Sequence, residues 1–249
     1  MTNVELDVRR YKVVRASLAV LAYLVLGGPC WFSAPVAVGG NSVGTKSVRV
    51  DALITRFDAM TISKVTVGDQ EIQPGRRSGP RGVESGAPFQ ADDDWLKNMS
   101  ITIKNRTDRV IVCVEVQLSF PDLGDGTAER PATVYTIRVG QLPEWALYYR
   151  DGTKMGPDPA KKPLLLAPGK TLEIRVGDFI DQIRPVVEER LPFQQVTRVD
   201  ISRHFVYFQG GMRWDGASYE IPTTDHPGYY TKLATDYFPG NPSQYPPRE

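Results

Sequence analysis

The chain has 249 residues, about one and a half to two times the length of a typical domain, so it can bury a sizeable core. Its hydrophobic fraction of 41% and charged fraction of 24% are those of a soluble globular protein, which excludes a disordered chain, a collagen and a multi-span membrane protein. The net charge of +1 provides no basic surplus for a nucleic-acid backbone, and the counts of Cys 2 and His 2 exclude a disulfide scaffold and a histidine-rich metal site.

The N-terminal segment 1–39 has the layout of a secretory signal. Basic residues precede an apolar run at 16–26, and helix-breaking glycine and proline follow it. Small residues at Ala37 and Gly39 suit cleavage before Gly40. An uncleaved signal anchor is the alternative. Because the basic flank lies on the N-terminal side, both alternatives place the rest of the chain outside the cytoplasm, in the periplasm, the cell envelope or the extracellular space, with or without attachment to the inner membrane.

The two cysteines fall on either side of the expected cleavage position. Cys30 follows Pro29, and Gly27 stands where a bacterial lipoprotein signal carries leucine, so we do not expect acylation. If the leader is removed, Cys113 is the only thiol left. The mature chain then forms no intramolecular disulfide.

Alternating apolar residues predict strands through most of the chain that follows. The first two lie at 48–54 and 60–67, and a phase slip at Ser63-Lys64 in the second indicates a bulge. Two further runs flank the turn sequence Asn-Arg-Thr-Asp and predict a hairpin of 99–103 with 110–120. Its second strand should point one set of side chains inward: Val110, Val112, Val114, Val116, Leu118 and Phe120. Later strands are expected at 133–139, 171–176 and 199–208.

One helix is expected between the last two strands. Its apolar residues are spaced by three, four and four positions, at Ile180, Ile183, Val187 and Leu191. Asp178 would cap the N-terminus, and Pro185 should kink the helix or mark a restart. Many strands with one late helix predict a mostly β fold, an antiparallel β-sandwich with an inserted helix.

The expected domain organisation is a leader at 1–39, a β-sandwich at 47–214 and a Pro/Tyr-rich C-terminal extension at 215–249. Within the sandwich, the connection 68–94 is rich in glycine, proline and arginine. Long connections of this composition favour disorder over regular structure.

Two stretches carry a resemblance to a known family. In the first, a strand ends in Lys104-Asn105, a polar turn follows, and the next strand leaves at Phe120-Pro121. The second is 206–216, Val-Tyr-Phe-Gln-Gly-Gly-Met-Arg-Trp-Asp-Gly. They resemble the immunoglobulin-like β-sandwich domains of uncharacterised exported bacterial proteins, over roughly 59–214. The resemblance implies an immunoglobulin-like sandwich with a binding or scaffold role, and it implies no catalytic residue or ligand.

No motif for chemistry stands out. There is no Gly-x-Ser-x-Gly, His204 falls within a strand, and His226 falls in turn sequence. The acidic groups at 92–94 and 122–125 lack the spacing of a calcium loop. We therefore assign no catalytic residue, no metal site and no cofactor.

Aromatic residues in the long connections are the candidate site. Trp145, Tyr148 and Tyr149 lie in one connection, and Trp214 lies at the start of the tyrosine-rich tail. Exposed rings of this kind can stack on a sugar or anchor a protein. The alternative is that they pack over the open ends of the sandwich.

These features favour an exported, non-enzymatic binding or interaction module. Its partner would be a protein or glycan at the cell envelope, with no nucleic acid involved and membrane contact only through the N-terminal segment. The alternative is an exported carbohydrate-active hydrolase whose carboxylate pair would come from scattered residues such as Glu144 and Asp151.

Overall fold

The computed structural model describes residues 43–50, 58–72, 75–78, 82–83, 88–124, 127, 132–149, 151–156 and 162–233. The predicted leader, its cleavage position and Cys30 lie outside these ranges, as does the last part of the tail. All described residues belong to one unit of the chain, Gly40–Glu249. No helix among them is both long and apolar enough to cross a membrane.

The described chain is built mostly from β-strands, with one α-helix and three short 3-10 turns. The strands are β1 Gly44–Val50, β2 Met60–Val67, β3 Gln70–Ile72, β4 Gly75–Ser78, β5 Gly82–Val83, β6 Phe89–Ala91, β7 Met99–Asn105, β8 Ile111–Phe120, β9 Thr133–Gly140, β10 Thr171–Arg175, β11 Arg198–Phe208, β12 Met212–Trp214, β13 Tyr219–Pro222 and β14 Tyr230–Lys232. The helix is α1 Ile180–Glu188, and the 3-10 turns are η1 Glu144–Ala146, η2 Val176–Phe179 and η3 Phe193–Gln195.

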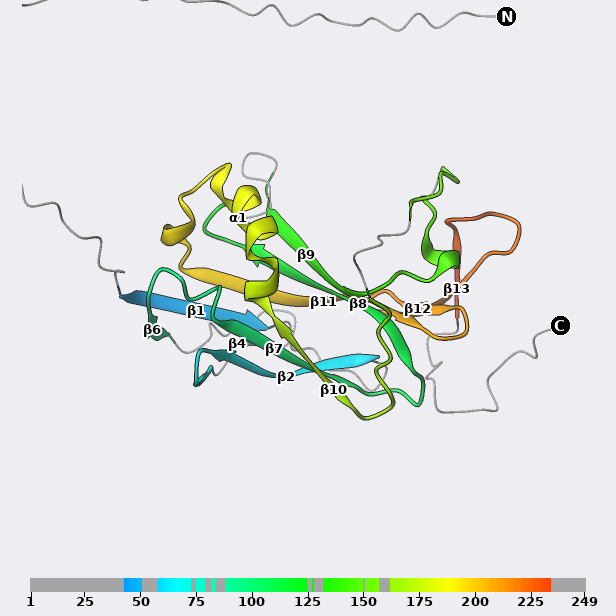
Figure 1. Cartoon of the computed structure of the whole chain (residues 1–249), viewed down its shortest axis with the longest axis horizontal. Coiled ribbons are helices and arrows are strands. Elements are labelled where there is room, and N and C mark those ends of the chain that lie inside the picture. Colours follow the sequence, from blue (N-terminus) through cyan, green and yellow to red (C-terminus); the bar gives the residue numbers. More distant parts are fainter. Residues whose placement is uncertain are drawn as a thin grey trace, which may run out of the picture. The chain divides into compact units, whose positions relative to one another are not determined.

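The strands form two sheets (Figure 1). A four-stranded sheet has the order β10-β7-β2-β3. A ten-stranded sheet runs β14-β13-β12-β11-β1-β4-β5, with β8 paired to β11, β9 paired to β8, and β6 paired to β1. The long strand β11 lies at its centre, where β8 lines one side and the other side is shared by β1 and β12.

The predicted hairpin of residues 99–103 with 110–120 is wrong. β7 pairs with β2 and β10 in the four-stranded sheet, whereas β8 pairs with β9 and β11 in the ten-stranded sheet. The turn between them does form, because Asn105 Oδ1 accepts a hydrogen bond from the Thr107 amide at 2.9 Å. Turn chemistry specifies a reversal but no partner strand. Here the chain leaves one sheet and enters the other.

The expectation of a wholly antiparallel fold is also wrong. β1 runs parallel to β11, with Arg49 directly opposite Asp200 and paired to it, and parallel to β4. A parallel pair requires a long crossover connection. Between β1 and β11 the chain passes through the whole four-stranded sheet, which supplies that crossover.

Several local predictions are confirmed. The register of β2 on β7 shifts between Ile62 and Lys64, where the bulge was expected. Ile180, Ile183 and Val187 face the core from α1. The helix continues through Pro185 to Glu188 without a restart. The predicted cap is wrong, because η2 runs directly into α1 and places Phe179, which makes no capping bond, at the N-cap.

One hydrophobic core joins the two sheets and the helix. Both sheets contribute fully buried residues to this core. They are Val65, Ile101 and Ile103 from the four-stranded sheet, and Val114, Val116, Val206, Phe208 and Trp214 from the ten-stranded sheet. Both faces of β8 are buried over Cys113–Val116, whereas Val112 at its start is only half-buried.

Two segments are more structured than expected. The connection 68–94 contains β3, β4, β5 and β6, of which β3 and β6 pair with β2 and β1. The expected extension 215–249 contains β13 and β14, which continue the ten-stranded sheet to Lys232. Such strands of two to four residues are too short to show a hydrophobic period, so composition alone described these segments.

Candidate functional site

Trp145 lies on η1, in the connection that leaves the end of β9. Its neighbours Leu142, Ala146 and Leu147 are buried and form a second apolar cluster with Cys113 and Tyr207. Cys113 and Tyr207 adjoin the core residues Val114 and Val206 along β8 and β11, and successive strand residues point to opposite faces. The connection therefore covers the face of the ten-stranded sheet that points away from the main core.

The Trp145 ring is held by aromatic residues from two other strands. It lies 5.9 Å from the Tyr207 ring of β11 and 6.3 Å, edge-on, from the Tyr230 ring of β14. Phe205 adds a further ring at 6.0 Å from Tyr207. We call these four residues the Trp145 cluster. Trp145 itself is half-buried, so part of its indole faces solvent.

Arg213 binds the cluster from the neighbouring strand. It stands opposite Tyr207 on one side and Glu220 on the other, and its Nη2 lies 2.7 Å from Glu220 Oε2. The guanidinium also stacks 3.2 Å from the centre of the Tyr230 ring and 4.9 Å from that of Phe205. Cation–π contact with two rings and a buried carboxylate fix this side chain.

Burial raises the pKa of both phenols of the cluster. Desolvation raises the pKa of Tyr207 far above its ordinary value. It also raises the pKa of Tyr230, and the nearby Arg213 offsets part of that rise. The cluster is therefore an uncharged support for the Trp145 ring.

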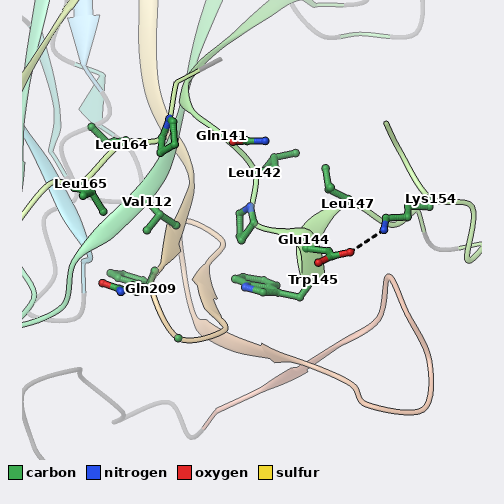
Figure 2. A pocket seen from close by; sticks show the side chains of 14 residues that line it. Val112, Gln141, Leu142, Glu144, Trp145, Leu147, Lys154, Leu164, Leu165 and Gln209 are labelled. Atoms are coloured by element: carbon green, nitrogen blue, oxygen red, sulfur yellow. Dashed lines mark hydrogen bonds and ion pairs between the residues drawn. The ribbon is translucent and has the colours of Figure 1, made fainter. Parts of the chain in front are cut away.

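A groove of about 510 Å³ opens beside this support (Figure 2). Trp145 and Leu142 line one side of it, and Val112, Leu164 and Leu165 line the other. Leu165 is 73% exposed, so its side chain is open to solvent at the edge of the groove. The polar side chains that line the groove are those of Gln141, Gln209, Glu144 and Lys154.

The two carboxylates suggested for hydrolysis have the wrong environment for a general acid. Glu144 is 81% exposed and accepts a hydrogen bond from Lys154 Nζ at 2.9 Å, which lowers its pKa. Asp151 is exposed and accepts the Thr153 amide at 2.9 Å, which lowers its pKa too. A glycosidase acid needs a raised pKa. These two residues do not provide one.

The four predicted binding residues are not brought together. Tyr148 is half-buried beside Lys154, and Tyr149 is 56% exposed, but neither lines the groove. Trp214 is 0% exposed and packs in the main core, with the Arg203 guanidinium 5.6 Å from its ring. A ring with no exposed surface has nothing to offer a ligand, so Trp214 is not part of this site.

Sequence reasoning missed Phe205, Tyr207 and Arg213. The run Phe-Val-Tyr-Phe at 205–208 is apolar at successive positions, which does indicate that something covers the second face of the strand. What covers it is the connection carrying Trp145 together with β14, and no local pattern connects those segments.

Two of the aspartates considered for calcium, Asp122 and Asp92, accept hydrogen bonds from backbone amides. Asp122 Oδ2 accepts the amides of Thr197 and Arg198 at 2.7 and 3.0 Å, and Asp92 Oδ1 accepts the Asp94 amide at 3.0 Å. In the part of the chain that the structure describes, no three His, Cys, Asp or Glu side chains gather where they could hold a metal ion.

No protein-family model, no curated protein and no solved structure matches this chain.

Proposed function

We propose that the chain is an exported, non-enzymatic interaction module that binds a peptide segment of a partner protein in the groove beside Trp145. The observation that carries the proposal is the half-buried indole of Trp145, fixed by Tyr207 and Tyr230 at the edge of an apolar groove. A rigid aromatic ring beside an open apolar surface is typical of an anchor point in protein recognition.

The lining of the groove favours a peptide over a glycan. Both walls are aliphatic or aromatic, and two of the polar residues at the groove, Glu144 and Lys154, are already paired with each other. A sugar ring that loses water here would leave several hydroxyls without partners, at a cost for each. Apolar and proline side chains of an extended peptide have no such cost, and aromatic grooves commonly bind them.

The location and the finer fold belong to the same proposal. The basic and apolar leader supports export. Two sheets around one core, with a helix late in the chain, support an immunoglobulin-like β-sandwich. The parallel pairing of β1 with β11 would be a departure from that fold. Sandwich domains typically present their connections for recognition, as Trp145 is presented here.

The groove can be tested with a library of short, proline-containing peptides selected on the full-length chain. Peptides that bind the groove should lose affinity by at least about tenfold on Trp145→Ala, as expected for removal of an aromatic anchor. Leu165→Asp should weaken them similarly with little effect on folding, because this side chain is already exposed.

Tyr149→Ala is the matched control, since Tyr149 is an exposed aromatic residue of the same connection outside the groove. Its affinity should stay within about twofold of the parent, the range of a near-neutral contact. Circular dichroism and thermal melting would confirm that all three variants fold. Selected peptides that bind Trp145→Ala and Leu165→Asp as tightly as the parent, or a library that yields no binder, would overturn the proposal.

A further inference from the structure

The described chain ends beside the groove. β14 contributes Tyr230, whose ring contacts Trp145, and three residues later the Leu233 amide donates to the Tyr219 carbonyl at 2.8 Å. The sequence then continues from Ala234 to Glu249. Extended chain covers about 3.3 Å per residue, so this segment can span about 50 Å, enough to reach every part of a groove that begins at Trp145.

The composition of that segment matches the groove. Its charged residues lie at its ends, at Asp236, Arg248 and Glu249, and the stretch 237–247 between them reads Tyr-Phe-Pro-Gly-Asn-Pro-Ser-Gln-Tyr-Pro-Pro. This uncharged run of aromatic residues and prolines would meet apolar walls without burying a charge. Its prolines also lower the entropy that an extended segment loses on binding.

Covalent attachment strengthens even a weak match. A binding segment joined through a short linker has an effective concentration in the millimolar range. A contact too weak to detect with a free peptide would therefore be well populated within one chain. An external partner has to compete with it.

We propose that residues 237–247 of the same chain occupy the groove beside Trp145 and compete with external peptides for it. The inference rests on the proposed function, because it assigns an occupant to the same groove. It makes the C-terminal segment a built-in competitor, so that partners with a higher affinity than the tethered segment are favoured.

Photo-crosslinking on the full-length chain tests the occupant. A benzophenone amino acid replaces Leu165 in the groove or, as control, Val134, an exposed apolar residue on β9 outside the groove. We expect the probe at 165 to crosslink mainly to residues 237–247, and the probe at 134 to do so at least about tenfold less. Equal yields from the two positions, or no crosslink to this segment, would overturn the proposal.

Mixing isotope-labelled and unlabelled chains identifies which copy supplies the segment. If the two peptides joined by each crosslink carry the same label, the segment occupies the groove of its own chain. A crosslink between a labelled and an unlabelled peptide would assign the groove to a second copy and overturn the proposal. Crosslinks from 165 to the N-terminal leader would overturn it as well.

A selected peptide then separates this inference from the proposed function. Replacing Tyr237, Phe238 and Tyr245 with serine should increase the apparent affinity for that peptide several-fold, because it removes a competitor. If the peptide crosslinks at 165 while the chain's own segment never does and the serine variant changes nothing, the inference fails and the binding function stands. If neither crosslinks, both fail.

Discussion

Asp58 and Arg203 form an ion pair in the interior of the protein. Arg203 Nη1 lies 2.5 Å from Asp58 Oδ2, and each side chain is only 5% exposed. Asp58 lies just before β2 of the four-stranded sheet, and Arg203 lies on β11 of the ten-stranded sheet and also donates to the Met60 carbonyl at 3.4 Å. The pair therefore connects the two sheets.

Asp58→Ala should lower the free energy of unfolding by about 3 to 5 kcal/mol, because it leaves a buried guanidinium without its carboxylate. Urea denaturation followed by tryptophan fluorescence measures this cost. Glu71→Gln is the control, since it breaks the exposed pair with Lys64 on β2 and should cost at most about 1 kcal/mol. The double variant Asp58→Leu with Arg203→Met should lose less unfolding free energy than Asp58→Ala. A larger loss in the double variant would mean that the charged pair itself stabilises the fold.

Asn105 holds the crossing between the sheets. Its Nδ2 donates to the carbonyls of Arg109 and Leu166 at 2.7 and 3.0 Å, and its Oδ1 accepts from the amide and hydroxyl of Thr107, both at 2.9 Å. Asn105→Ala should cost about 2 to 4 kcal/mol, at about 0.5 to 1 kcal/mol for each of the four lost bonds. Asn105→Asp should cost at least as much at neutral pH, because a carboxylate cannot donate to those carbonyls.

The exposed Asn98 provides the comparison, and Asn98→Ala should change stability by less than about 0.5 kcal/mol. Chemical denaturation of the three variants measures the differences. Near-parental stability for Asn105→Asp would show that the side chain does not donate to both carbonyls.

The fate of the predicted hairpin shows what local sequence can specify. Period-two alternation identified the longer strands and the bulge in β2, and the spacing by three and four positions identified the inward face of α1, because each depends on which side of one element is buried. Pairing depends on what occupies the edges of a strand. Both edges of β7 are taken by β2 and β10, so β8 has no place beside it.

Only part of the candidate site could be predicted, because local sequence does not show which distant segments come into contact. Trp145 lines the groove as an aromatic residue of a long connection, but its contact with Tyr230 joins segments far apart in the chain. Trp214 looked equivalent in sequence. It lies on a three-residue strand where Arg213 points to the cluster and Trp214 to the core, and so short a strand has no pattern that shows its phase.

Gly140 shapes the wall of the groove. It has φ of 94°, and a Cβ at this position would collide with the Val112 carbonyl and lie 2.8 Å from Leu164 Cβ. Both neighbours line the groove. Gly140→Ala should cost about 2 to 4 kcal/mol, of which about 1 comes from the left-handed backbone and the rest from overpacking.

Gly152→Ala isolates the backbone part of this cost. Gly152 has φ of 81° and no atom within 4 Å of a new Cβ, so its substitution should cost about 1 kcal/mol. The difference between the two melting curves measures the close approach at Gly140. Equal costs would indicate that the wall of the groove yields to an added methyl group.

His204 should make the fold sensitive to mild acid. Burial lowers its pKa below the ordinary 6.5, Arg213 lowers it further, and Glu115 and Asp215 act in the opposite direction. Because the folded pKa lies below the unfolded one, the unfolded chain binds the proton more readily. The contribution of His204 to stability is therefore complete above pH 6.5 and declines as the pH falls from there toward the folded pKa.

His204→Gln should remove that part of the pH dependence, so that its stability falls less than that of the parent as the pH is lowered below 6.5. Thermal melting between neutral pH and about pH 5, a window below the ordinary histidine pKa, measures the two slopes. His226→Gln is the matched control, because it makes the same replacement at an exposed residue, on the loop before β14. If the parent and His204→Gln lose stability in parallel as the pH falls, the pKa of His204 does not differ between the folded and the unfolded chain. The carboxylates of the fold would then account for the acid response.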